Sequence, residues 1–172
     1  MYIEIKEIGP EGLVVDRDIT YTLPAPRAGE DEVTVGPVKL SGELQKDGAE
    51  VAFSGDIETL ARLTCSRCLE PYRLPLDLHF DLRYTAEPEA AGAGESRVDE
   101  HSITVVHYDG ARIGLEDLLG EQILLGLPLK PLCRQDCGGL CPHCGTNRNA
   151  LACGCSTERG ADPRLATLKK LL

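Results

Sequence analysis

The sequence contains no tryptophan, only two phenylalanines and a single methionine, so aromatic and thioether side chains contribute little to any core. We expect a core built from leucine, valine and isoleucine instead, because 42% of the 172 residues are hydrophobic. That fraction supports one compact domain, with or without a small additional module, and it excludes an intrinsically disordered chain.

Long hydrophobic runs are also missing. No stretch approaches the ~20 apolar residues of a membrane-spanning helix, and residues 1–8 lack the apolar segment and cleavage site of a signal peptide. We therefore expect a cytoplasmic protein without membrane contact. In that reducing compartment, closely spaced cysteines are metal ligands or redox thiols more often than disulfides.

Basic residues are scarce, since 18 lysines and arginines face 28 aspartates and glutamates, for a net charge of −10. This balance argues against a general nucleic-acid coat protein. The charge is uneven: residues 1–127 hold 11 basic and 25 acidic residues, whereas residues 128–172 hold 7 basic and 3 acidic ones. The basic end is either a solvated surface or a contact for RNA phosphate or an acidic partner. Its candidate contact residues are Arg134, Arg148, Arg159, Arg164, Lys169 and Lys170.

Apolar and polar residues alternate with the period of β-strands through residues 38–57. Asp47-Gly48, a dipeptide typical of hairpin turns, interrupts this alternation, so we predict an antiparallel strand pair around it. A second run is clearer, because every other residue from Leu74 to Tyr84 is apolar. Pro75 within this run cannot donate a ladder hydrogen bond, which predicts an edge strand or a position where no donor is needed.

Small and acidic residues without periodicity fill residues 85–100, which predicts a loop. Apolar residues at Ile103, Val105 and Val106 then indicate one more strand, and Asp109-Gly110 indicates a turn after it.

The period changes to that of a helix at residues 115–126, and Pro128 ends this helix. A last short helix is predicted from Asp162-Pro163, because Asp caps a helix and Pro fits its first turn. The pattern therefore predicts an α+β protein, with an antiparallel β-rich body at residues 1–127 and one internal helix. Residues 128–172 are expected to form a cysteine-rich zinc-knuckle module that ends in the short helix and packs on the body.

Eight cysteines arrive in four close pairs, and two residues between thiolates let both sulfurs turn toward one ion. Zinc takes four such ligands in a tetrahedron, so eight sulfurs match two structural Zn²⁺ ions. We favour one site from the first two pairs and a second, local site from the last two. An interleaved arrangement, a single filled site with free thiols, and a ligand role for His143 stay open. The predicted metal ligands are Cys65, Cys68, Cys133, Cys137, Cys141, Cys144, Cys153 and Cys155.

Catalysis is not expected from this pattern. A catalytic zinc keeps an open position and commonly uses His or carboxylate ligands, whereas sites made of cysteine alone are usually closed and structural. Thiol redox chemistry at Cys65 and Cys68 is the main rival. Redox thiols are activated at a helix N-terminus, whereas this motif joins two predicted strands, and His79, His101 and His107 are not tied to any nucleophile.

Four sequence blocks resemble the YceD family of bacterial large ribosomal RNA accumulation proteins. They are LTCSRCL at 63–69, LLGEQILLGLP at 118–128, the cysteine block at 133–155 with its GGLCPHCG, and DPRLATL at 162–168. Together they cover the chain from about residue 60 onward. The first 60 residues match only as generic strands.

The resemblance implies a non-catalytic role in the synthesis, processing or stability of large-subunit ribosomal RNA. The partner would be that RNA, its precursor particle, or a ribosome-assembly protein, and no small-molecule substrate is implied. Two other classes remain open on the sequence: a zinc-bearing adaptor between proteins, and a thiol redox protein.

Overall fold

The chain is mostly β-strand with one α-helix, as seen in a computed structural model that describes residues 1–24, 33–48, 50–86, 104–108 and 110–155. The predicted α+β class is confirmed. In chain order the elements are β1 (Tyr2–Glu4), the 3₁₀ turn η1 (Ile5–Glu7), β2 (Leu13–Ile19), β3 (Thr34–Val35), β4 (Val38–Asp47), β5 (Glu50–Thr64), β6 (Pro71–Thr85), β7 (Thr104–His107), β8 (Arg112–Gly114) and α1 (Leu115–Gly126).

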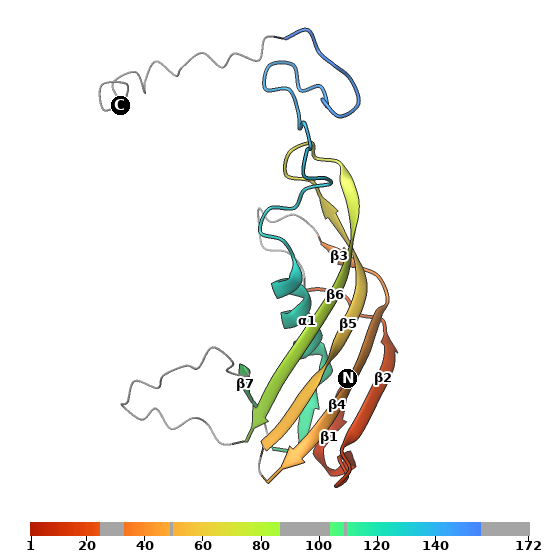
Figure 1. Cartoon of the computed structure of the whole chain (residues 1–172), viewed down its shortest axis with the longest axis vertical. Helices are drawn as coiled ribbons and strands as arrows, with labels where there is room; N and C mark the ends of the chain where they lie inside the picture. Colours follow the sequence, from red (N-terminus) through yellow and green to blue (C-terminus); the bar gives the residue numbers. More distant parts are fainter. Residues whose placement is uncertain (25–32, 49, 87–103, 109, 156–172) are drawn as a thin grey trace, which may run out of the picture.

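Six strands form the main sheet, in the order β2-β4-β5-β6-β7, with β3 pairing on the part of β5 beyond β4 (Figure 1). The strand pairs are antiparallel except β6 with β7, which run parallel. A separate two-stranded sheet joins β1 to β8. The antiparallel prediction therefore holds for the body, and the parallel β6–β7 pair is an addition that the sequence pattern did not indicate.

The two predicted strand regions form consecutive hairpins. Asp47 pairs with Glu50 across the first turn, where Gly48 supplies the positive φ of 60°. Strands β5 and β6 are each 15 residues long and pair from end to end, which makes the hairpin about 50 Å long. Its far end extends beyond α1 (Figure 1), so the turn between β5 and β6 is available to another part of the chain.

Pro75 illustrates how this hairpin tolerates a residue without an N–H. It lies opposite Leu60, whose carbonyl oxygen accepts a hydrogen bond from Gly36 on the other side of β5. Both backbone groups of a residue in an antiparallel strand point the same way, so the Pro75 nitrogen faces away from β5. Strand β7 pairs only with the opposite end of β6, from Leu82 to Thr85. The predicted edge position is thus observed.

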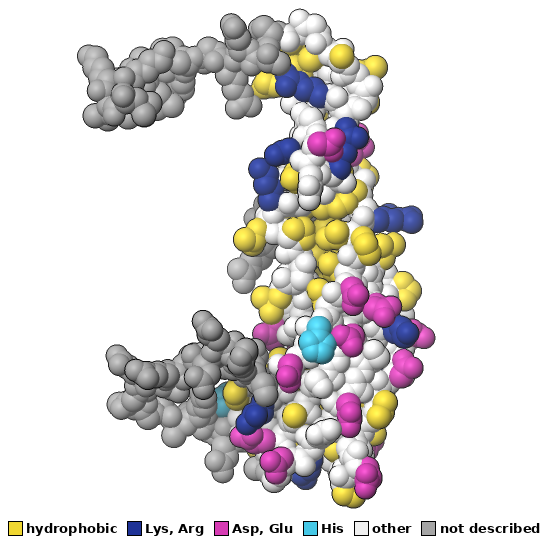
Figure 2. Space-filling model, viewed as in Figure 1, with side chains coloured by type: hydrophobic (Ala, Val, Ile, Leu, Met, Phe, Trp, Pro, Cys, Tyr) yellow, Lys and Arg dark blue, Asp and Glu magenta, His cyan; other side chains and the backbone are white. Residues whose placement is uncertain are grey.

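One face of the sheet is buried beneath α1 and the β1–β8 ribbon. Leu115, Leu118, Leu119 and Ile123 of α1 are buried in the same core as the inward residues of β4, β5 and β6. The helix has the predicted bounds of 115–126. The other face of the sheet is open to solvent, and Figure 2 shows acidic side chains gathered over much of it.

Several predictions fall on residues that the structure does not describe. Most of the predicted loop at 85–100 lies there, although Thr85 belongs to β6. The predicted helix from Asp162 and residue Ile103 lie there as well, whereas Val105 and Val106 belong to β7. Within the described ranges, α1 is too short to cross a bilayer, and no other helix is long and apolar enough to do so.

A pair of glycines lets two aromatic rings enter the middle of the core. Gly42 and Gly55 lie opposite each other on β4 and β5, and a Cβ on Gly55 would be 2.8 Å from Gly42 Cα and 3.0 Å from Phe80 Cζ. The space left by the missing side chains is filled by Phe53 and Phe80, whose ring centroids are 5.0 Å apart in an edge-to-face arrangement. Any larger residue at Gly55 must displace backbone or ring atoms.

We predict that Gly55→Ala lowers the free energy of unfolding by about 1–3 kcal/mol, because overpacking forces backbone shifts in a closely packed core. Urea denaturation followed by circular dichroism measures this change. Ser54→Ala on the solvent face of the same strand is the matched control and should change stability by less than about 0.5 kcal/mol. Equal stability of Gly55→Ala and Ser54→Ala would contradict the packing argument.

Candidate metal centre

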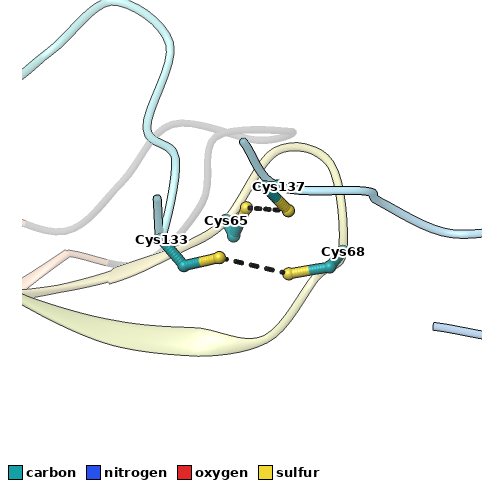
Figure 3. A group of neighbouring side chains, drawn as sticks. All are labelled: Cys65, Cys68, Cys133 and Cys137. Atoms are coloured by element: carbon teal, nitrogen blue, oxygen red, sulfur yellow. Dashed lines mark hydrogen bonds between the residues drawn. The ribbon is translucent and has the colours of Figure 1, made fainter. Parts of the chain in front are cut away.

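The first four predicted ligands meet at the tip of the β5–β6 hairpin (Figure 3). Cys65 and Cys68 belong to the turn between the strands, whereas Cys133 and Cys137 follow α1. Their sulfur atoms all lie within 4.8 Å of one another. The hairpin and the segment after the helix therefore contribute two ligands each.

The sulfur spacing fits a single tetrahedral ion. Cys65 Sγ and Cys137 Sγ are 3.7 Å apart, and so are Cys68 Sγ and Cys133 Sγ. A zinc ion with Zn–S bonds of about 2.3 Å places its tetrahedral sulfurs about 3.8 Å apart, whereas a disulfide bond is about 2.05 Å long. The spacing matches one central ion and leaves no room for a cluster of several irons.

Backbone hydrogen bonds shape the turn that presents the first pair. Leu69 N–H donates to the Cys65 carbonyl at 2.9 Å, and Cys65 N–H donates to the Glu70 carbonyl at 3.0 Å. Leu69 adopts a positive φ of 59°, which is unusual for a residue with a branched side chain. These bonds fold residues 65–70 into a knuckle that directs two thiols to the same side.

A second set of hydrogen bonds holds the segment after α1 against this knuckle. Ser66 donates to the Pro131 carbonyl from both its N–H, at 2.9 Å, and its hydroxyl, at 3.0 Å. The Arg67 carbonyl accepts from Leu140 N–H at 2.9 Å, and the Arg67 guanidinium donates to the Cys137 carbonyl at 3.0 Å. We call this contact between residues 65–70 and 131–140 the clasp.

The other four predicted ligands form a second group. Cys141, Cys144, Cys153 and Cys155 place their sulfurs within 4.8 Å of one another. Cys141 N–H donates to the Thr146 carbonyl at 2.8 Å, and Gly145, with a φ of 73°, donates to the Cys141 carbonyl at 2.9 Å. This group is local in sequence and more exposed than the first, since Cys144 is exposed whereas Cys65, Cys68 and Cys137 are buried.

The thiols of each group differ in acidity. Burial opposes ionisation of Cys65, but backbone N–H groups of Cys133, Cys68 and Arg67 outweigh it and lower the pKa to about 6. Burial and the neighbouring Cys137 raise the pKa of Cys133 to about 12. In the second group, backbone N–H groups of Cys144 and His143 lower the pKa of Cys141 to about 5.

Cys155 has a raised pKa of about 12, because its thiol lies in hydrogen-bonding contact with Cys144 and Cys141. In each group, therefore, one thiol loses its proton readily while another keeps it, because a second thiolate would be repelled by the first. A divalent cation between four thiolates removes that repulsion. The donor set thus fits Zn²⁺, although zinc itself stays a prediction.

Asn149 is a supporting residue that the cysteine pattern did not indicate. Its Nδ2 donates to Cys137 Sγ at 3.2 Å, while its Oδ1 accepts from Gly138 N–H at 2.8 Å and from the Arg134 guanidinium at 2.9 Å. The Asn149 hydrogen bond is the leading cause of the lowered pKa of Cys137. The available signal was a hydrogen-bonding side chain between Cys144 and Cys153, but sequence spacing alone does not aim it at a sulfur of the other group.

The basic candidates divide into two sets. Arg148 lies with its guanidinium 3.8 Å from Cys141 Sγ, and Arg134 contacts Asn149 and Asp136. Both therefore have partners within the chain. His143 is exposed and is not among the donors of either group in the described chain. The remaining candidates lie outside the described residues: Arg159, Arg164, Lys169 and Lys170.

The fold and the sulfur geometry define a β-sheet protein whose cysteine-rich end can hold two metal ions. The model of one family, described as large ribosomal RNA subunit accumulation protein YceD, matches residues 53–172. That match covers more than half of the chain and includes nearly all of the long hairpin, α1 and both cysteine groups. The chain belongs to the YceD family, as its sequence blocks indicated.

Curated relatives come from bacteria and plants. A protein of Mycobacterium tuberculosis described as uncharacterized is 35% identical over 63% of this chain and 49% of its own length. A protein of Zea mays, named large ribosomal RNA subunit accumulation protein YCED homolog 1, chloroplastic, is 25% identical over 77% of this chain and 54% of its own length. The chain thus spans about half the length of these relatives, and no solved structure matches it.

We predict that the purified chain binds about two equivalents of zinc and that the two groups fill independently. Cys65→Ser and Cys153→Ser should each lower the content to about one equivalent, as elemental analysis under reducing conditions will show. The melting temperature should fall further for Cys65→Ser, because that group joins the hairpin to the segment after α1, whereas the second group is local. Content below one equivalent in the unaltered chain contradicts the two-site assignment.

Asn149→Ala is predicted to weaken metal binding at the first group about 10- to 100-fold, the usual effect of losing a residue that supports a metal ligand. Competition with a chromophoric chelator measures the affinity. Gln135→Ala is the matched control, because it removes an exposed amide from the same segment and leaves its backbone contact to Arg67 in place. Identical chelator competition by the two variants would rule out a role for Asn149.

Proposed function

We propose that this chain is a non-catalytic cytoplasmic factor that promotes accumulation of large-subunit ribosomal RNA, with two structural Zn²⁺ ions at its cysteine-rich end. The family match over residues 53–172 is the observation that carries the proposal. The name of the Zea mays relative supports it in the same direction. The direct partner is the RNA or its precursor particle, or alternatively a ribosome-assembly protein.

The sulfur geometry supports a structural role for zinc. Four thiolates around one ion leave no position open for substrate or water. The ion of the first group would connect the hairpin tip to the segment after α1, which the clasp already aligns. Binding free energy at such a site contributes directly to folding. Zinc would therefore keep the far half of the hairpin in a fixed relation to α1.

The position of the CxxC motif argues against the redox alternative. Cys65 and Cys68 lie in a turn between two strands rather than at the start of a helix. The lowered pKa of Cys65 therefore comes from the backbone N–H groups of the clasp and not from a helix dipole. Both sulfurs are buried and lie 3.7 Å from Cys137 and Cys133. Access of a disulfide substrate to these sulfurs is restricted.

A deletion strain tests the proposal. We predict that loss of the gene lowers the ratio of large-subunit to small-subunit ribosomal RNA, which gel analysis of total RNA measures at several temperatures. The unaltered gene should restore the ratio, and Cys65→Ser should restore it less well because the folded clasp is lost. Gln135→Ala is the control and should complement fully. An unchanged ratio in the deletion strain at every temperature excludes the proposed function.

A further inference from the structure

Near the tip of the long hairpin, residues that face each other across β5 and β6 on the solvent side are chemically alike. Moving along β5 and β6 toward the cysteine end, Glu58 faces Asp77, Leu60 faces Pro75, and Arg62 faces Arg73. An acidic pair, an apolar pair and a basic pair thus follow one another. All six side chains lie on the exposed face of the sheet.

The two arginines have no hydrogen bond or ion pair with any described residue of the chain. The acidic pair is four residues away along each strand, or roughly 13 Å, which is too far for an ion pair. Like charges directly opposite on a sheet are unfavourable. Among the described residues nothing compensates the positive charge of the Arg62–Arg73 pair, so an external anion would stabilise it.

The surface around this pair is hollowed on both sides. A hollow of about 310 Å³ is lined by both arginines and by Gly36 and Leu60 at the β3–β5 edge. A second hollow of about 220 Å³ is lined by the same arginines with Pro71 and Tyr72. Both arginines therefore line recesses rather than a flat strand surface, which leaves room for an anion beside them.

Other arginines at the same end are less available. Arg67 donates to the Cys137 carbonyl, Arg134 contacts Asn149, and Arg148 faces Cys141. They contribute positive field, and Figure 2 shows Lys and Arg side chains toward the upper end of the molecule, with acidic side chains below. The arginines without a described partner, Arg62 and Arg73, belong to the hairpin, within the acidic part of the sequence at residues 1–127.

We infer that Arg62 and Arg73 form a binding site for the phosphate backbone of RNA on the exposed face of the β5–β6 hairpin. The inference rests on the proposed function, which makes RNA the anionic partner to consider. Guanidinium forks bind phosphate oxygens in a bidentate manner. The neighbouring Glu58–Asp77 pair repels the same backbone and so confines the contact to the hairpin tip.

The test compares binding of two RNA probes, a fluorescent oligouridine and a transcript of large-subunit ribosomal RNA, to the zinc-loaded full chain over a series of salt concentrations. Arg62→Gln/Arg73→Gln should weaken binding roughly tenfold at physiological salt and reduce the slope of log K against log salt by about 1.4, or 0.7 per lost phosphate contact. Zinc content should stay the same and the melting temperature should not fall, because both side chains are exposed, have no partner among the described residues and face a like charge.

Lys39→Gln/Lys46→Gln is the matched control, since it removes the same charge from exposed positions on β4 of the same sheet. It should leave affinity and slope nearly unchanged. If both double variants weaken RNA binding equally, the effect comes from the overall positive charge of the protein, and the proposed site is overturned. Equal binding by the arginine variant and the unaltered chain overturns it too, as does preference for a polyglutamate peptide over both RNAs.

The outcomes separate this inference from the proposed function. If the deletion strain loses large-subunit RNA while the purified chain binds neither RNA probe, the function stands and the phosphate site fails. If the deletion strain is unaffected while RNA binding depends on Arg62 and Arg73, the site stands and the proposed function fails.

Discussion

The clasp between the β5–β6 tip and the segment after α1 is the contact on which the organisation of the molecule depends. Among the described residues, α1 and the β1–β8 ribbon lie nearer the other end of the long hairpin, although its inward residues Ala61, Leu63 and Leu76 are buried as well. The clasp ties the tip of this hairpin to the segment after α1. Four sulfurs with tetrahedral spacing lie at its centre, and backbone hydrogen bonds from Ser66 and Arg67 align the two segments around them.

Hydrogen bonding and sulfur chemistry support each other in this clasp. The backbone N–H groups that lower the pKa of Cys65 to about 6 belong to both segments of the clasp. Asn149 extends the arrangement toward the second group, because it contacts Cys137 Sγ while its own neighbour Arg148 faces Cys141. The two cysteine groups therefore share no ligand, but the residues that support them, Asn149 and Arg148, are neighbours in the chain. At this end of the molecule, polar contacts are combined with a small buried cluster, in which Tyr72 and Leu132 pack against the cysteines of the first group.

The arginines that are left without a described partner are decided by strand pairing in the hairpin, and not by which part of the sequence is basic. The sequence divides into an acidic first part and a basic last part, yet Arg62 and Arg73 belong to the acidic part and face each other near the cysteine end. Conversely, Arg134 and Arg148 of the basic part have partners within the chain. Strand register decides this outcome, because pairing two distant residues places their side chains next to each other on one face.

Local patterns in the sequence by themselves determined the hairpin around Gly48, the alternation of β6, the bounds of α1 and the pairing of cysteines into close sets. Each of these depends on residues within one strand, turn or helix, where side-chain period and turn chemistry act directly. The tertiary structure alone decided that β7 runs parallel to β6, that Asn149 reaches Cys137, and that Arg62 lies opposite Arg73. It also brought Cys65 and Cys68 to Cys133 and Cys137, which the sequence could only favour among alternatives. These contacts join residues of different strands, turns or loops, and their geometry follows from register and packing, which no pattern within one element encodes.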